Sequence, residues 1–148
     1  MIQSLIFLYQ RDIQRLHAEI SAYKEEKNLW LVEGEISNSA GNLCLHLVGN
    51  LNHFIGHVLG GTDYVRNREF EFAGKNVERK KLLESIHAVG QTVKETLEKL
   101  SEDTFSEPFP LQVFKTPYST EQMLLHLAGH LNYHLGQINY HRRLLEKD

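Results

Sequence analysis

This chain of 148 residues contains nine histidines, and the way they cluster in the sequence is unusual for a domain of this size. Seven fall in two segments, which hold His46, His53 and His57, and then His126, His130, His134 and His141. On a helix, residues four apart lie on one face, about 6 Å apart along the axis. The pair His130 and His134 therefore predicts two imidazoles aimed at one divalent ion, for which histidine is a common ligand.

A third ligand must come from a facing helix. His46 lies on the same side as the apolar stripe of its own segment, which favours it as that ligand. His53, His57 and His126 are alternatives, since each could replace His46 or hold a ligand in place by a hydrogen bond. Three neutral imidazoles would leave the ion with its full charge and an open position, as in catalytic sites. The competing interpretation is that these rings only hydrogen-bond within a helical core.

Other site chemistries fit the sequence less well. The chain has no His-Glu-x-x-His motif, and Glu84 to His87 is its one Glu-x-x-His, whereas a di-iron bundle needs two. Cys44 precedes His46 by two residues, about 200° around a helix, so we expect a small core residue and not a second ligand. The remaining histidines are interpreted as ordinary surface or partly buried residues: His17, His87 and His141.

Four long amphipathic helices are predicted from the apolar spacing, at about residues 2–23, 39–59, 77–100 and 119–146. Asn38 or Ser39 is expected to cap the second, Asn76 the third, and Ser119 with Gln122 to form a capping box on the fourth. Residues 62–75 are expected to be an ordered loop. The sequence thus predicts an all-α, antiparallel four-helix bundle in a single domain over residues 1–148.

The net charge and the hydropathy of the sequence argue against two classes of partner, nucleic acids and membranes. The net charge is −3 and no basic stripe is visible, which argues against a nucleic-acid partner. No apolar run is long enough to cross a bilayer, so no membrane association is expected. The first nine residues lack the basic region and cleavage site of a signal peptide, which favours a cytoplasmic location.

The chain resembles the DinB/YfiT-like superfamily of metal-dependent four-helix bundles along nearly its whole length. Its marks are His46 within residues 45–51, and the motif His-x-x-x-His-x-Gly-Gln at residues 130–137. Residues 66–72 are similar to an arginine-rich segment of one branch. The resemblance implies that His46, His130 and His134 bind zinc or, as the second choice, nickel, and that the protein forms a homodimer.

The resemblance also implies an activity. Characterised members include thiol-dependent S-transferases that use low-molecular-weight thiols such as bacillithiol, and a mycothiol-dependent maleylpyruvate isomerase. We therefore expect a transferase whose metal activates a thiol. A metal-dependent hydrolase that activates water, and a non-catalytic bundle stabilised by its metal, remain the alternatives.

Four further residues are candidates to support catalysis. Asn50 lies one turn after His46 and Gln137 one turn after His134, so either could orient a ligand or substrate. Arg66 and Arg68 could hold an anionic substrate. The competing interpretation for both arginines is a salt bridge with Glu69 or Glu71.

Overall fold

The computed structural model describes residues 1–146 of the chain, and these residues are helical throughout apart from their connections. A single isolated bridge pairs Pro108 with Ser119 in the described part. The all-α class expected from the apolar periodicity is therefore confirmed. No helix in residues 1–146 is both long and apolar enough to cross a membrane.

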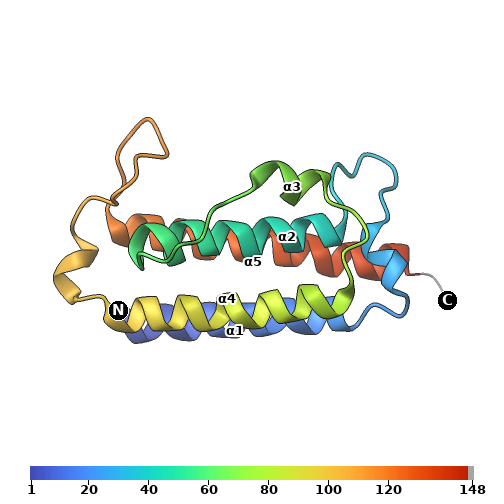
Figure 1. Ribbon diagram of the computed structural model, residues 1–148, viewed down its shortest axis with the longest axis horizontal. Helices are drawn as coiled ribbons and strands as arrows, with labels where there is room; N and C mark the ends of the chain where they lie inside the picture. The colour runs from blue at the N-terminus through green and yellow to red at the C-terminus, as the bar shows by residue number, and fades with distance from the viewer. Residues whose placement is uncertain (147–148) are drawn as a thin grey trace.

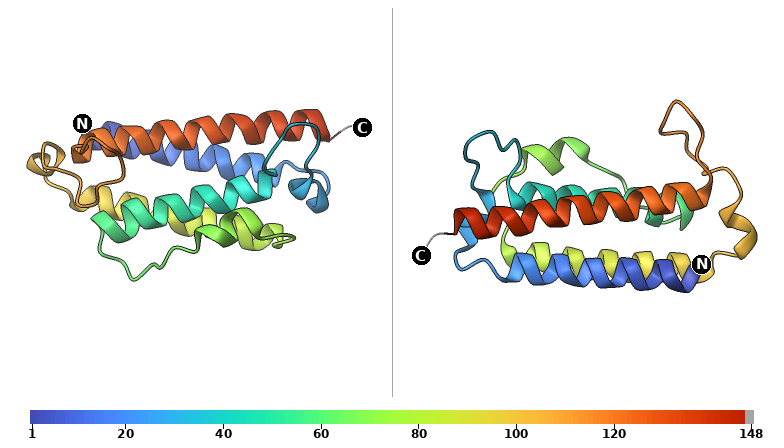
Figure 2. Two further views of the ribbon diagram at one scale, coloured as in Figure 1. Left: turned by 90° about the horizontal axis from the view of Figure 1, so that it is seen from above. Right: turned by 180° about the vertical axis from the view of Figure 1, so that it is seen from behind.

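The helices follow one another as α1 (Ile2–Ser21), η1 (Glu26–Trp30), α2 (Ala40–Leu51), η2 (Asn52–Leu59), α3 (Arg68–Ala73), α4 (Arg79–Lys99), η3 (Glu102–Phe105) and α5 (Thr120–Leu145). Four long segments, with η2 continuing α2, lie side by side along the long axis of the molecule (Figures 1 and 2). α1 packs against α4 and α5, while α2 packs against α5 and α4. The short helix α3 lies across the outer side of α2.

Local signals placed two of the helix starts correctly. The side chain of Ser39 accepts a hydrogen bond from the backbone amide of Asn42 at 3.2 Å, which caps α2. Ser119 and Gln122 form the predicted capping box on α5, with hydrogen bonds of 3.2 and 2.9 Å.

Two other local predictions were wrong. The segment of residues 62–75 is not only a loop, because α3 forms there, started by the Asn67 side chain that accepts from the amide of Phe70 at 3.0 Å. Asn76 does not cap a helix either: its φ is +55°, a left-handed conformation that asparagine tolerates, and α4 begins only at Arg79.

The core is built from the predicted apolar stripes. Its fully buried members come from all four long segments and include Leu5, Leu16, Leu47, Leu51, Ile86, Leu97, Leu124 and Leu127. Trp30 anchors the first connection, because its indole ring packs so closely on Gly41 that a Cβ there would lie 2.7 Å from it. That close approach makes Gly41 a requirement of this packing.

His141 corrects a prediction, since it is buried and not a surface residue. Its Nδ1 lies 2.7 Å from the hydroxyl of Tyr23, and its Nε2 lies 2.9 Å from the carbonyl oxygen of Leu31. A carbonyl can only accept, so Nε2 carries the hydrogen and Nδ1 accepts from Tyr23. This pairing ties the C-terminal part of α5 to α1 and to the first connection.

Asp12 is a buried charge that α1 shares with α5. Its carboxylate accepts from Arg11 at 2.8 Å and from Asn132 at 3.1 Å, and Arg15 lies 3.4 Å away. Burial alone would raise the pKa of this carboxyl, but the hydrogen bonds from Arg11 and Asn132 outweigh it and hold the pKa below its ordinary value. The carboxylate therefore favours the folded state only while it is ionised.

The Asp12→Asn variant is expected to lose about 1–2 kcal/mol of stability at pH 7, the size of a hydrogen bond to a charged group. Because the folded pKa is depressed, this contribution is present above the unfolded value of about 4 and disappears as pH falls through the folded pKa. The difference in melting temperature between the variant and the parent should therefore be smaller at pH 3 than at pH 7. The exposed Asp63→Asn variant is the control, and an unchanged gap at both pH values would contradict the prediction.

Candidate metal centre

Three histidines from two helices converge at one point. His46 on α2 is buried, and His130 and His134 on α5 are partly buried. One nitrogen from each ring lies within 4.8 Å of the others, and the Nε2 atoms of His46 and His130 are 3.1 Å apart. Two imidazole nitrogens bound to one zinc ion at 2.0–2.1 Å lie about 3.3 Å apart at a tetrahedral angle. The spacing therefore fits a shared divalent ion.

His46 is oriented by a carboxylate. Its Nδ1 lies 2.9 Å from Oε1 of Glu71, so Nδ1 donates and Nε2 presents a lone pair toward the other two rings. Carboxylate–histidine pairs of this kind fix the tautomer and the ring orientation of metal ligands. Burial alone would raise the pKa of Glu71, but hydrogen bonds from Arg66 and His46 outweigh it and lower that pKa.

His134 is oriented in the same way by an amide. Its Nδ1 lies 2.6 Å from Oε1 of Gln137, whose Nε2 in turn lies 3.3 Å from the hydroxyl of Tyr133. Since the amide oxygen accepts, Nδ1 of His134 carries the hydrogen and Nε2 is left with its lone pair. Gln137 thus stands where the sequence predicted a supporting residue.

The ring of His130 is held neutral by its surroundings. Burial, followed by the neighbouring rings of His134 and His46, lowers the pKa of His130 to about 4. Its Nδ1 is buried and has no hydrogen-bond partner among the described residues. Burial also lowers the pKa of His134, against the opposing effect of Gln137. Both rings are therefore in the neutral state that binds metal ions at pH 7.

The short helix α3 brings Glu71 to the site. Glu71 is buried, and its two oxygens accept from Arg66 at 2.8 and 2.9 Å. A Cβ on Gly49 of α2 would lie 2.7 Å from Cδ of Glu71, so this carboxylate reaches His46 only because position 49 is glycine. Phe72, also on α3, packs its ring 4.8 Å from the ring of His46.

The Gly49→Ala variant tests that close approach. The added methyl group is expected to displace the Glu71 carboxylate and to cost about 1–3 kcal/mol, the usual range for overpacking. The hydrogen bond to His46 should be lost, which NMR can follow as a shift of the His46 Nδ1 proton. Gly129→Ala is the matched control, because a Cβ there meets nothing within 4 Å. Equal stability of the two variants would contradict the role given to Gly49.

Comparison with known proteins assigns the chain to a family. The family model described as "Protein of unknown function (DUF1572)" matches residues 2–148. The chain belongs to the DUF1572 family. Its histidine motifs, Glu71 and Gly49 all lie within the matched residues.

A solved structure is similar to this DUF1572 protein over almost its whole length. It is described as the crystal structure of the conserved protein of locus from Enterococcus faecalis. The TM-score is 0.75 at 18% identity, and the alignment covers 98% of the DUF1572 chain and 96% of the other. At this identity the likeness shows the fold alone. No curated protein matches the chain.

The structure separates the other candidate histidines of the DUF1572 protein from the centre. Within residues 1–146, the cluster of side chains that could bind a metal ion contains only His46, His130 and His134. His53 and His57 stack on each other with ring centroids 6.1 Å apart, and His126 packs edge-on against Phe114 at 4.9 Å. Their predicted alternative roles as metal ligands are not supported by this arrangement.

The two candidate arginines are already engaged. Arg66 forms the salt bridge with Glu71 that the sequence offered as the competing interpretation, so its guanidinium supports His46 through Glu71. Arg68 lies over the ring of Phe72, with Cζ 5.0 Å from the centroid. Arg66 therefore lies behind the histidine cluster, and a role for either arginine in holding a substrate stays a prediction.

Asn50 and Cys44 complete the candidates near His46. Asn50 is buried, and its Oδ1 has no hydrogen-bond partner among the described residues. Cys44 is fully buried, and burial raises the pKa of its thiol to about 12. A thiol that stays protonated is a poor ligand and a poor nucleophile, which agrees with its prediction as a small core residue.

The contact between Glu71 and His46 was missed by sequence reasoning. Glu71 was considered only as a partner for an arginine, and 25 residues separate it from His46. The sequence nevertheless carried a usable signal. Glu71 lies close to Arg66 and Arg68 in one short segment, and such a grouping suggests a buried ion pair.

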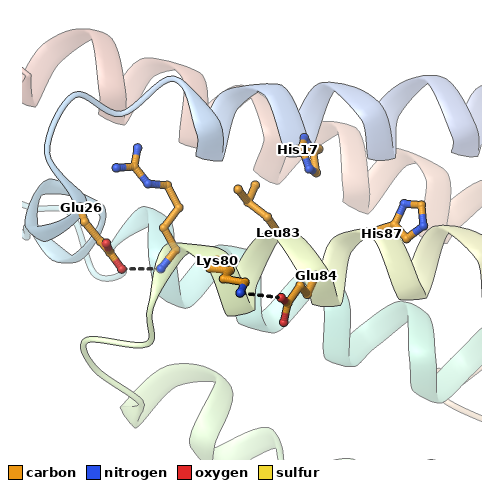
Figure 3. A pocket seen from close by; sticks show the side chains of 7 residues that line it. His17, Glu26, Lys80, Leu83, Glu84 and His87 are labelled. Carbon is orange, nitrogen blue, oxygen red and sulfur yellow. Dashed lines mark hydrogen bonds and ion pairs between the residues drawn. The ribbon is translucent and has the colours of Figure 1, made fainter.

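A different region of the DUF1572 protein contains a hollow of about 620 Å³ (Figure 3). It lies along α4 between His17 of α1 and Glu26 of η1, away from the three-histidine cluster. Its charges are largely paired: Lys80 lies 3.9 Å from Glu84, and the backbone amide of Arg79 donates to Glu26. This hollow offers no group of three metal-binding side chains among the described residues.

Proposed function

We propose that this DUF1572 protein is a metal-dependent enzyme that binds one divalent ion through His46, His130 and His134. The observation that carries the proposal is the convergence of three imidazoles, two of them oriented by Glu71 and Gln137. We also propose that the four long helical segments form the antiparallel bundle of the DinB/YfiT-like superfamily. Zinc is the proposed ion and nickel the second choice, because imidazole ligands suit both.

The proposed reaction is thiol-dependent S-transfer. A bound divalent ion would supply a Lewis acid that favours the anionic form of a thiol or of water. The protein's own part is to hold the ligand rings in fixed orientations. Glu71 and Arg66 hold His46 from behind, while Phe72 covers one side of that ring.

Access to the cluster supports catalysis over a purely structural metal. His134 and its partner Gln137 also line a separate hollow of about 490 Å³, which is within the usual size range of small-molecule sites. A metal that only joins helices would need no such opening beside a ligand. The hollow therefore favours an enzyme with a small-molecule substrate.

The test is turnover by zinc-loaded protein with 1-chloro-2,4-dinitrobenzene and, in turn, cysteine, glutathione and bacillithiol. The thiol sulfur would form a bond to the ring carbon and chloride would leave, which absorbance follows directly. We expect a rate above that of chelator-treated protein, and loss of that excess in His130→Ala. Equal rates with and without metal for every thiol would contradict S-transfer. Metal-dependent hydrolysis of p-nitrophenyl acetate without thiol would instead indicate a hydrolase.

The resemblance also implies a homodimer. This stays a prediction, and light scattering of the purified protein measures it as a mass of twice the 17.2 kDa chain. A single-chain mass at micromolar concentration would contradict it.

A further inference from the structure

A hollow of about 490 Å³ opens directly beside the proposed metal ligand His134. One wall is a face of α5, on which Tyr133, Gln137, Tyr140 and Leu144 follow at helical spacing. The opposite wall is residues 35–38, the connection that precedes α2. A molecule in the hollow would thus have one end at His134 and its body along α5.

The side chains of this hollow suit a flat apolar group. Tyr133 and Tyr140 are 65% and 64% exposed, and Leu144 is 58% exposed, which is unusual for three large residues on one helix face. Aromatic rings of this kind bind other rings by offset or edge-on stacking. The geometry therefore favours an aromatic or similarly flat body.

The charge of the hollow is negative. Glu35 is exposed and forms no ion pair among the described residues, and no lysine or arginine lines the hollow. A guanidinium does lie nearby, with Cζ of Arg143 5.5 Å from the Tyr140 ring, but it does not line the hollow.

We propose that this hollow binds the non-reacting part of the substrate, and that this part is an aromatic group with a cationic end. The ring would stack on Tyr133 and Tyr140, and the cation would face Glu35, with the tyrosine rings adding cation–π attraction. The inference rests on the proposed function for its reacting end, which it places at His134. Anionic aromatic conjugates are disfavoured, because Glu35 would repel them and no cation in the lining would pair with them.

The experiment compares three probes of similar size by calorimetry: benzyltrimethylammonium, benzyl alcohol and benzenesulfonate. We expect the cation to bind about two- to fivefold more tightly than the alcohol, the range for an exposed ion pair, and the sulfonate to bind most weakly. Glu35→Gln should remove the advantage of the cation over the alcohol. Tyr140→Leu should weaken benzyl binding about two- to tenfold, since it keeps apolar area but removes the ring.

Controls keep the inference separate from the proposed function. Glu33→Gln, an exposed carboxylate of the same connection outside the hollow, should leave the order of the probes unchanged. The titrations are run with zinc-loaded and with chelator-treated protein, so that binding of the probes is read independently of metal and of turnover. Tightest binding of benzenesulfonate, or an unchanged preference in Glu35→Gln, would overturn the inference even if the metal centre is active. Retained cation preference in a protein that binds no metal would overturn the proposed function instead.

Discussion

The His130→Ala protein is expected to bind no divalent ion stoichiometrically and to lose the stabilisation that the ion confers on the parent. The Nε2 atom of His130 lies 3.1 Å from Nε2 of His46, and His130 lies one turn before His134 on α5. Two remaining imidazoles do not complete a tetrahedral site. An ion present at a hundred times its dissociation constant stabilises the folded state by about 2.7 kcal/mol, or roughly 5–10 °C for a chain of this length.

The measurement is elemental analysis of protein purified without a nickel column, followed by thermal melts with added zinc and with chelator. His126→Ala is the control, because His126 sits one turn earlier on α5, is exposed and lies outside the cluster. The control should keep the ion and the zinc-dependent melting shift. Stoichiometric zinc in His130→Ala would rule out the three-histidine centre, and an unfolded chelated variant would be recognised by its circular dichroism.

The Glu71→Ala variant is expected to lose about 3–5 kcal/mol of stability, the usual cost of removing one member of a buried ion pair. Its partner Arg66, whose side chain is 14% exposed, would be left with an uncompensated charge, and Nδ1 of His46 would lose its acceptor. Zinc affinity should also fall about 10- to 100-fold, as it does when the partner of a ligating histidine is removed.

Urea denaturation in chelator measures the stability change without any contribution from metal. Glu69→Ala, an exposed carboxylate on the same short helix, is the matched control and should change stability by less than about 0.5 kcal/mol. The double variant Arg66→Met/Glu71→Ala should be less destabilised than the sum of the single variants, because it no longer buries a lone charge. Strict additivity would show that Arg66 and Glu71 do not act as a pair.

Much of the helical framework could be predicted from the sequence, and so could the pair of α5 histidines in the proposed metal centre. The capping box of Ser119 and Gln122 and the cap at Ser39 depend on neighbours within a few residues. The same holds for His130 and His134, whose shared face follows from the pitch of a single helix. Cys44 was placed in the core and away from His46 by the same argument.

Local interactions could not choose among the remaining histidines. His46 lies on α2, which packs against α5, whereas His53 and His57 lie on η2, which packs against α4, and this docking decides which ring meets His130, 84 residues away from His46 in the sequence. That docking is set by core packing between distant stripes. The same packing buried His141 against Tyr23 and brought the short helix α3, with Glu71, back across Gly49.

By itself, then, the sequence determined the all-helical class, the caps of α2 and α5 and the paired imidazoles of α5, because each is governed by bonds and contacts within about one helical turn. The sequence favoured His46 as the third ligand but left His53, His57 and His126 as alternatives, and tertiary structure decided that the ring of His46 meets the pair and that Glu71 stands behind it. Those contacts depend on how whole helices dock, and docking depends on shape and burial summed over many side chains far apart in the chain.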